Sequence, residues 1–174
     1  MTGESTLRVP PEIEPRLRAA RSAVVLTGAG ISAESGLGTF RGPGGLWEKF
    51  RPQDLATPQA FASRPAVVWS WYCERWRSMR AVAPNPGHAA ISRWPALFSS
   101  FLLVTQNIDG LHQRAGSPEV LELHGSLSRA RCESCAQRIP MDDAMARTGS
   151  PPRCSCGGRL RPDVVWFGEM LPPG

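Results

Sequence analysis

The sequence predicts an α/β protein: a Rossmann-like parallel sheet with a small insert of the four-cysteine zinc-ribbon type. Apolar runs at 23–27 and 101–105 alternate with helix-like segments, which is typical of a parallel sheet. Four cysteines fall within 25 residues, at 132–156, and mark the insert. The length of 174 residues suits one main domain carrying such an insert. The expected parts are a Rossmann-like part over 1–125 with a helical insert at about 48–95, a zinc-binding insert over 126–161 and a returning strand over 162–174.

The first half of the chain is predicted to begin with a helix and a strand. The helix covers 11–21, and the strand at 23–27 is apolar on both faces, as a buried strand of a parallel sheet must be. A long glycine-rich loop over 28–47 follows. Helices are then expected to start at Thr57-Pro58, at Pro65 and at Asn85-Pro86, the last one ending at Trp94-Pro95.

The second half continues the alternation. The run at 101–105 is the next buried strand, a short helix closes at Gly116, and 120–123 forms a third strand. After the cysteine-rich insert, 162–167 returns as an extended segment. Strands that alternate with helices in this way pair in parallel through right-handed crossovers.

Composition argues against a membrane protein and a nucleic-acid-binding protein. No apolar stretch approaches the roughly 18 residues of a membrane span, and the polar N-terminus is unlike a signal peptide, so a cytoplasmic protein is expected. The net charge of +5 comes with 20 basic residues, of which only Lys49 is a lysine. The arginines are scattered, and their tightest group is Arg75, Arg77 and Arg80 in a helix-like segment. Nucleic acid is therefore not expected as a partner.

The clustered cysteines have the spacing of a structural metal site. Cys132 and Cys135 form a Cys-x-x-Cys pair, and Cys154 and Cys156 form a tighter Cys-x-Cys pair that two glycines follow. Without a secretion signal this pattern indicates zinc rather than disulfides, and four thiolates leave no open position for water. One structural Zn2+ is expected, the alternative being reduced thiols without a metal. Cys73 stands apart and is expected to pack as a small hydrophobe.

A dinucleotide-binding turn is predicted directly after the first strand. Gly28-Ala29-Gly30-Ile31-Ser32-Ala33 fits G-x-G-x-x-G/A, whose glycines let backbone N–H groups approach a pyrophosphate. The acidic residue expected about 20 positions further on, after a second strand, is missing. Asp54 lies near that distance, but in a loop-like stretch. The turn therefore fits a hydride-transferring dehydrogenase poorly.

Two further motifs end the other strands of the predicted sheet. Thr105-Gln106-Asn107-Ile108-Asp109 closes the second strand, and Glu122-Leu123-His124-Gly125 closes the third. Because the carboxyl ends of parallel strands meet at one edge, these side chains are predicted to share a site with the glycine turn. His124 is placed like a general base, since an imidazole of pKa about 6.5 accepts a proton near neutral pH. His88 at a helix start and His112 in mid-helix are interpreted as structural.

These three motifs, extended by Glu34-Ser35-Gly36-Leu37-Gly38-Thr39-Phe40-Arg41-Gly42, resemble the sirtuins, the NAD-consuming protein lysine deacylases. The resemblance runs from about Ala20 to the last residue. It implies NAD as a consumed co-substrate, and acyl-lysine proteins or peptides as partners. It gives catalytic roles to His124, as the general base, and to Asn107. The cofactor-binding positions that it implies are Gly28, Ala29, Gly30, Ile31, Ser32, Phe40, Arg41, Trp47, Gln106, Asn107, Ile108 and Asp109.

The reaction that the resemblance implies transfers an acyl group onto the cofactor. Nicotinamide leaves the ribose, and the acyl oxygen of a modified lysine captures the C1′ carbon. His124 then helps to deprotonate a ribose hydroxyl, which attacks the captured acyl group. Water completes the release of free lysine and O-acyl-ADP-ribose.

Tyr72 and Arg75 lie three residues apart, on one face of the helix predicted from Pro65. The pair resembles the Tyr-x-x-Arg of the sirtuin branch that removes succinyl, malonyl and glutaryl groups, the class III sirtuins. A phenol beside a guanidinium suits a carboxylate, because arginine binds carboxylates through two bonds. Acetyl is a further substrate under this interpretation. The alternative is a tyrosine and an arginine on an ordinary amphipathic helix.

The segment Arg161-Pro162-Asp163-Val164-Val165-Trp166-Phe167-Gly168-Glu169 resembles the strand on which sirtuins bind their substrate peptide. The implied substrate-binding residues are Val165, Phe167 and Gly168, beside Tyr72 and Arg75. Backbone pairing by strand addition would give little sequence specificity.

Sirtuins continue beyond this point with strands and helices for the adenosine half of NAD, so a truncated sirtuin with an incomplete sheet is expected. Two alternatives stay open. A non-catalytic NAD- or ADP-ribose-binding module would need only the glycine loop. A zinc-ribbon interaction protein would need only the cysteines, but residues 129–161 contain no aromatic side chain for base stacking. The protein substrates and the oligomeric state are open.

Overall fold

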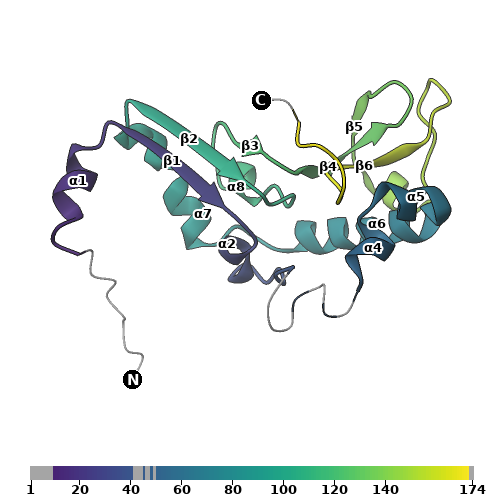
Figure 1. The fold of residues 1–174 in the computed structure, drawn as a ribbon, viewed down its shortest axis with the longest axis horizontal. Coiled ribbons are helices and arrows are strands. Elements are labelled where there is room, and N and C mark those ends of the chain that lie inside the picture. Colours follow the sequence, from purple (N-terminus) through teal and green to yellow (C-terminus); the bar gives the residue numbers. More distant parts are fainter. Residues whose placement is uncertain (1–9, 41–44, 46–47, 49, 173–174) are drawn as a thin grey trace.

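The chain forms two three-stranded sheets, with helices packed around them (Figure 1). The computed structural model describes residues 10–40, 45, 48 and 50–172. In the first sheet, β1 (Ser22–Thr27), β2 (Ser100–Thr105) and β3 (Leu121–Glu122) pair in parallel in the order β1-β2-β3. The register places Thr27 opposite Thr105, and Thr105 opposite Glu122. The predicted parallel sheet is confirmed, and its carboxyl ends are aligned.

The helices mostly follow the predicted starts. Thr57 and Asn85 are N-caps whose side chains accept backbone N–H bonds, and each is followed by proline. The predicted helix at 11–21 is shorter, and the segment predicted as a glycine-rich loop holds the short helix α2. The bounds are α1 Glu14–Ala19, α2 Gly30–Ala33, α4 Pro52–Leu55, α5 Pro58–Ser63, α6 Pro65–Ala81, α7 Pro86–Ile91, the 3-10 helix η1 Trp94–Leu97, α8 Leu111–Arg114 and α9 Asp143–Ala146.

The long helix α6 carries much of the hydrophobic core. Val68 and Trp69 are fully buried, and Trp76 and Met79 continue the same side of the helix. Cys73 is buried, as predicted for a small hydrophobe, and burial raises its pKa to about 11. Among the described residues no helix combines the length and the apolar character needed to cross a bilayer.

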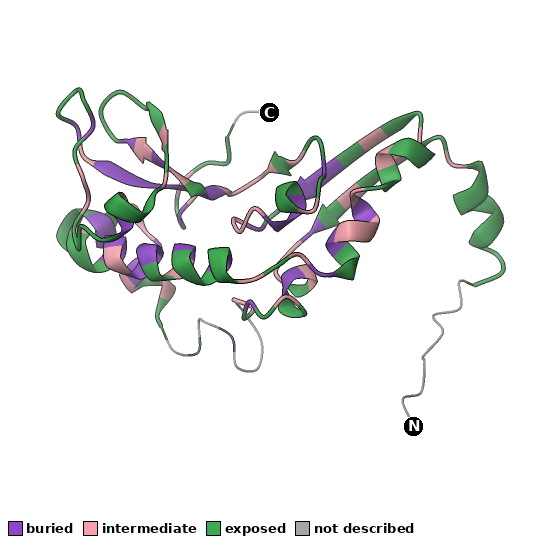
Figure 2. Ribbon diagram, turned by 180° about the vertical axis from the view of Figure 1, so that it is seen from behind, coloured by how far each residue is buried: buried purple, intermediate pink, exposed green. Residues whose placement is uncertain are grey.

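Within the described residues, the first sheet is covered on one face and largely open on the other, which corrects the expectation that β1 is buried on both faces. Val24 is 70% exposed and Leu26 is 62% exposed, and Leu102 of β2 is also exposed. Figure 2 shows this exposed stretch along β1 and β2. The opposite face carries the buried Leu103 and Thr105. Two-sided apolar patterning therefore indicated the parallel sheet correctly, although one of the apolar faces is largely uncovered within the described residues.

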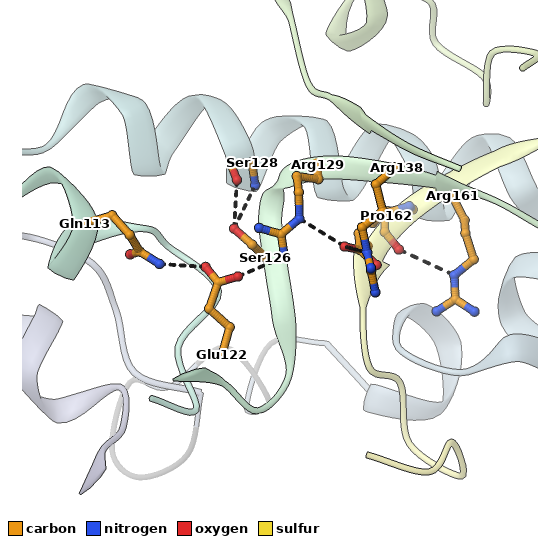
Figure 3. Close-up of polar contacts among 9 residues, drawn as sticks. Gln113, Glu122, Ser126, Ser128, Arg129, Arg138, Arg161 and Pro162 are labelled. Atoms are coloured by element: carbon orange, nitrogen blue, oxygen red, sulfur yellow. Dashed lines mark hydrogen bonds and ion pairs between the residues drawn. The ribbon is translucent and has the colours of Figure 1, made fainter. Parts of the chain in front are cut away.

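The second sheet is antiparallel and follows the first sheet directly. It consists of β4 (Gly125–Cys132), β5 (Arg138–Pro140) and β6 (Leu160–Val164), in the order β5-β4-β6. A polar network joins the two sheets (Figure 3). Glu122 of β3 accepts bonds from Gln113 and Arg129, each over 2.8 Å. Asp163 of β6 accepts from Arg129 and Arg138, over 3.1 and 2.9 Å.

Candidate active site

The aligned strand ends meet beside a cavity of about 660 Å³. Gln106 N donates to Thr27 O, and Leu123 N donates to Thr105 O, both over 2.9 Å, so the three motifs are tied together just past the strands. The cavity is lined by Gly28, Ala29, Gly30, Phe40, Tyr72, Gln106, Asn107, Ile108, His124 and residues 164–169, together with a few neighbours. A Cβ added at Gly30 would meet nothing within 4 Å, so this turn leaves open space for a ligand.

Four side chains form what we call the Ser32 network: Ser32, His88, Asn107 and Asp109. Ser32 Oγ donates to Asp109 Oδ2 over 2.7 Å and accepts from Asn107 Nδ2 over 3.1 Å. His88 Nε2 lies 3.4 Å from the same oxygen. Asn107 Nδ2 also donates to Gly28 O over 3.0 Å, which uses both amide protons and leaves the amide oxygen as an acceptor.

Of the two histidines interpreted as structural, His88 belongs to this network and His112 packs against His88. His88 and His112 are at most 1% exposed, and their rings are 4.9 Å apart. His88 caps α7, its Nδ1 accepting from Asn85 N over 3.3 Å. His112 Nε2 bonds to Thr27 Oγ1 over 2.9 Å, while its Nδ1 is buried without a partner in the described chain. Burial lowers the pKa of both histidines, so both are neutral near pH 7.

His124 is held by backbone on two sides. Its Nδ1 lies 3.0 Å from Gln106 O. A carbonyl only accepts, so Nδ1 carries the proton and Nε2 keeps its lone pair. The next residue, Gly125, has a φ of +73°, and a Cβ there would clash with the backbone carbonyl of Asp163. Glycine thus lets β4 approach β6 closely enough to fix His124, whose carbonyl accepts from Val165 N over 2.9 Å.

Tyr72 and Arg75, predicted from their spacing to share one face of α6, line adjoining recesses. Tyr72 lines the main cavity, and Arg75 lines a small recess that shares Phe40 and Asn107 with it. Arg75 Nε is buried and has no hydrogen-bond partner in the described part of the chain. Burial lowers the pKa of Arg75, as expected when no carboxylate lies close enough to offset the lost hydration. Its guanidinium carbon lies 5.9 Å from the centroid of the Phe40 ring.

The segment after β6 forms part of the cavity wall. Phe167 N donates to Ala56 O over 2.9 Å, which fixes this segment against the end of α4. Gly168 has a φ of +88°, a conformation that favours glycine, and turns the chain there. Val165, Phe167 and Gly168, predicted to bind substrate, all line the cavity.

The four clustered cysteines come together beside the last residue of β4, Cys132. The ligand atoms of Cys132, Cys135, Cys154 and Cys156 all lie within 4.8 Å of one another. Three of the sulfur–sulfur distances are 3.4, 3.5 and 3.9 Å. Tetrahedral zinc with Zn–S bonds of about 2.3 Å needs sulfurs about 3.8 Å apart. The donor set therefore fits one structural Zn2+.

Most of the predicted cofactor residues gather around the two recesses. Ser32 and Asp109 line the smaller recess beside Arg75. Ile31 lines neither recess; its carbonyl instead accepts from Asn85 Nδ2 over 2.6 Å. Arg41 and Trp47 lie outside the described residues.

Three residues at the site, His88, Trp166 and Glu169, were not predicted from the sequence to be functional. His88 touches Ser32, although its place at a helix start predicts only a structural role. Trp166 and Glu169 line the cavity wall. The signal for Trp166 was present in the segment Arg161 to Glu169, where an indole sits between an arginine and a glutamate, but only packing shows which side chain it meets.

A Rossmann-like sheet, a glycine turn at its edge and a tetracysteine cluster define a nucleotide-binding fold with a metal-binding module. The model of the Sir2 family matches residues 28–174, so the chain belongs to the Sir2 family.

Curated relatives support this assignment. The chain is 54% identical over 168 residues to an NAD-dependent protein deacylase of Thermus thermophilus, covering 94% of this chain and 65% of the relative. It is 56% identical over 157 residues to NAD-dependent protein deacylase 2 of Pyrobaculum aerophilum, covering 90% and 62%. The chain thus spans less than two thirds of the length of these relatives. The predicted C-terminal truncation stays a prediction.

Solved structures have the same fold. A Sir2 homologue in complex with NAD superposes with a TM-score of 0.85 at 46% identity, covering 95% of this chain and 65% of that one. A complex of Sir2 with a p53 peptide and NAD+ superposes with a TM-score of 0.78 at 35% identity, covering 93% and 66%.

Proposed function

We propose that this protein is an NAD-dependent protein-lysine deacylase that prefers acidic acyl groups such as succinyl, malonyl and glutaryl, with acetyl as a poorer substrate. The observation that carries the proposal is Arg75: a partly buried guanidinium beside Tyr72 that meets no acidic partner in the described chain. The family assignment and the relatives named as deacylases support the general activity. NAD, when bound, supplies the ribose that accepts the acyl group.

His124 is the proposed general base. Its Nδ1–H is engaged with the Gln106 carbonyl, which keeps the imidazole in the tautomer that has a free lone pair at Nε2. Because His124 lines the main cavity, this lone pair is available to a hydroxyl of a bound ribose. The surrounding backbone contacts fix the ring, which spares reorganisation during proton transfer.

Asn107 is the proposed second catalytic residue. Its amide protons bind Gly28 O and Ser32 Oγ, so its oxygen is the atom left for a ribose hydroxyl or an ordered water. Asp109, anchored by Ser32 and by Leu111 N, is the proposed acceptor for the nicotinamide amide. Gly28 and Gly30 are proposed to let the pyrophosphate approach the backbone.

Tyr72 and Arg75 are proposed to bind the distal carboxylate of the acyl group. An unpaired guanidinium is costly to bury, and a carboxylate ligand supplies the missing charge and up to two hydrogen bonds. An acetyl group has no such carboxylate, so it gains nothing from Arg75. The proposed acyl preference therefore comes from an ion pair between Arg75 and the acyl carboxylate, which forms only when the substrate is bound.

The test compares NAD-dependent removal of succinyl and of acetyl from one lysine peptide, in the wild-type protein and two variants. Arg75→Met is expected to lower succinyl kcat/KM about 10- to 100-fold, since hydrogen bonds to charged groups are worth about 1.5–3 kcal/mol, and to spare acetyl. His124→Ala is expected to abolish both reactions. Arg80→Met removes the same charge from an exposed site on the same helix and serves as the matched control.

Equal loss of both activities in Arg75→Met would contradict the acyl preference but not the deacylase activity. No turnover of either peptide by wild-type protein that binds NAD would contradict the deacylase activity itself, and would favour the non-catalytic NAD-binding module.

A further inference from the structure

The side chain of Trp166 is hydrogen-bonded to Tyr72 at the wall of the cavity. Trp166 Nε1 donates to Tyr72 Oη over 2.9 Å, and the two residues are 2% and 5% exposed. An indole N–H is a donor and never an acceptor. The Tyr72 oxygen therefore accepts in this bond, and its own proton points elsewhere.

The Tyr72 proton has no acceptor among the residues that the structure describes. Burial raises the pKa of this phenol far above neutrality, so the proton stays on the oxygen. Tyr72 lines the cavity, which makes a bound ligand the natural acceptor. Arg75, the next side chain on the same helix face, also offers only donors.

The backbone and the ring of Trp166 are both held by a partly buried ion pair. Arg161 binds Glu169 through two bonds of 2.6 and 2.9 Å, and Trp166 N donates to Glu169 Oε2 over 2.8 Å. The Arg161 guanidinium carbon lies 3.4 Å from the centroid of the Trp166 ring. The ring of Phe61 packs on another side, with centroids 5.2 Å apart. The indole therefore cannot turn away from Tyr72 without losing its ring contacts with the Arg161 guanidinium and with Phe61.

We propose that Trp166 is a specificity-positioning residue: its N–H occupies the Tyr72 oxygen and thereby makes the phenol an obligate donor toward a terminal carboxylate of the acyl group. The inference deepens the proposed function and rests on it. Tyr72 and Arg75 then present donors only, which a carboxylate satisfies with two oxygens. An alkyl end cannot use these donors, and an ammonium end would find no acceptor.

The test measures binding of a succinyl-lysine peptide and an acetyl-lysine peptide with identical flanks, by fluorescence anisotropy with NAD present, and kcat/KM for both peptides. Trp166→Phe keeps an aromatic ring but removes the N–H. We expect it to weaken succinyl binding about 5-fold relative to acetyl, the effect of one neutral hydrogen bond. The loss should appear in KM rather than in kcat, because the distal carboxylate lies away from the reacting atoms.

The double variant Tyr72→Phe/Trp166→Phe separates positioning from packing. If Trp166 acts through the Tyr72 hydroxyl, Trp166→Phe should have no further effect on the succinyl-to-acetyl ratio in the Tyr72→Phe background. Phe61→Leu disturbs packing on the same indole without touching the hydrogen bond, and should leave that ratio unchanged.

Different results would contradict the role of Trp166 and the proposed acyl preference. If Tyr72→Phe lowers the ratio while Trp166→Phe lowers succinyl and acetyl binding equally, Trp166 is merely structural and the inference is wrong. The same conclusion follows if Trp166→Phe lowers the ratio even without the Tyr72 hydroxyl. If wild-type protein shows no succinyl preference and Tyr72→Phe changes nothing, the proposed acyl preference fails, and the inference fails with it.

Discussion

The Ser32 network and the Tyr72–Arg75 pair lie on adjoining recesses, yet they differ in how far their polar groups are satisfied. Ser32 Oγ donates one bond and has two nitrogens within 3.4 Å, so its capacity is used inside the chain. Arg75 Nε is buried with no partner in the described chain, and the proton of Tyr72 likewise meets none there. Apart from the amide oxygen of Asn107, the Ser32 network is bonded within the chain, whereas the Tyr72–Arg75 pair keeps donors without acceptors.

This difference separates positioning from recognition. Groups that hold catalytic side chains gain from being fully bonded, because bonds made in advance remove the cost of ordering during the reaction. Groups that select a ligand must keep hydrogen-bond donors or acceptors without a partner in the free protein. A buried donor of this kind lowers the stability of the folded protein until the ligand binds. If the two regions divide the work in this way, substitutions in them should have different effects on the stability of the ligand-free protein.

Ser32→Ala tests the Ser32 network and should have the largest effect. The substitution removes the donor to Asp109 and one acceptor of Asn107, so buried groups lose their partners. We expect the free energy of unfolding to fall by about 1–3 kcal/mol, measured by urea denaturation. Ser78→Ala, which removes an exposed hydroxyl bonded to its own helix, is the matched control. An equal, small effect of both variants would contradict the role given to the network.

Acidification tests His88, a member of that network, and its neighbour His112, and should have a smaller effect. Burial lowers the pKa of His88 and of His112 in the folded protein. Protonated His88 lowers the pKa of His112 further, whereas the Asp109 carboxylate partly offsets the effect of burial on both histidines. The unfolded chain, with histidine pKa about 6.5, therefore binds protons first. Their contribution to stability is fully present above about pH 6.5 and is lost as the pH falls toward the lowered values.

The measurement is the melting temperature between pH 7.5 and pH 5.5, a window of about two pH units in which ordinary carboxylates stay ionised. Wild-type protein should melt at a lower temperature at the acidic end. His112→Gln should show a smaller difference between the two pH values, even if it is less stable throughout. A melting temperature that rises on acidification would contradict the sign of this linkage.

The sequence was sufficient for those parts of the site that follow from strand topology. Gly28, Asn107 and His124 each end or follow a strand of one parallel sheet, and parallel pairing brings such ends together whatever the loops do. Tyr72 and Arg75 share a face because helix geometry fixes a three-residue spacing. The cysteine cluster followed from ligand chemistry and short spacings.

Contacts between distant elements could not be predicted in this way. His88 meets Ser32 across 56 residues, and Trp166 meets Tyr72 across 94. Each contact depends on how one element packs against another, and no local periodicity encodes that. The prediction that Val24 and Leu26 are buried was wrong for a related reason. An apolar strand face indicates what the strand can bury, but it does not indicate whether another element covers that face within the described residues.

Arg75→Met tests the Tyr72–Arg75 pair and has the smallest expected effect on stability, near zero or favourable. It therefore gives the clearest contrast with Ser32→Ala. Methionine retains an unbranched stem to pack beside Phe40 and removes a desolvated guanidinium that no described carboxylate offsets. The free energy of unfolding of the ligand-free protein should therefore stay unchanged or rise by up to about 1 kcal/mol. Urea denaturation of this variant beside Ser32→Ala gives the contrast directly. If Arg75→Met destabilised the protein as much as Ser32→Ala does, Arg75 would be a structural residue, and the unmet capacity on which acyl recognition depends would not exist.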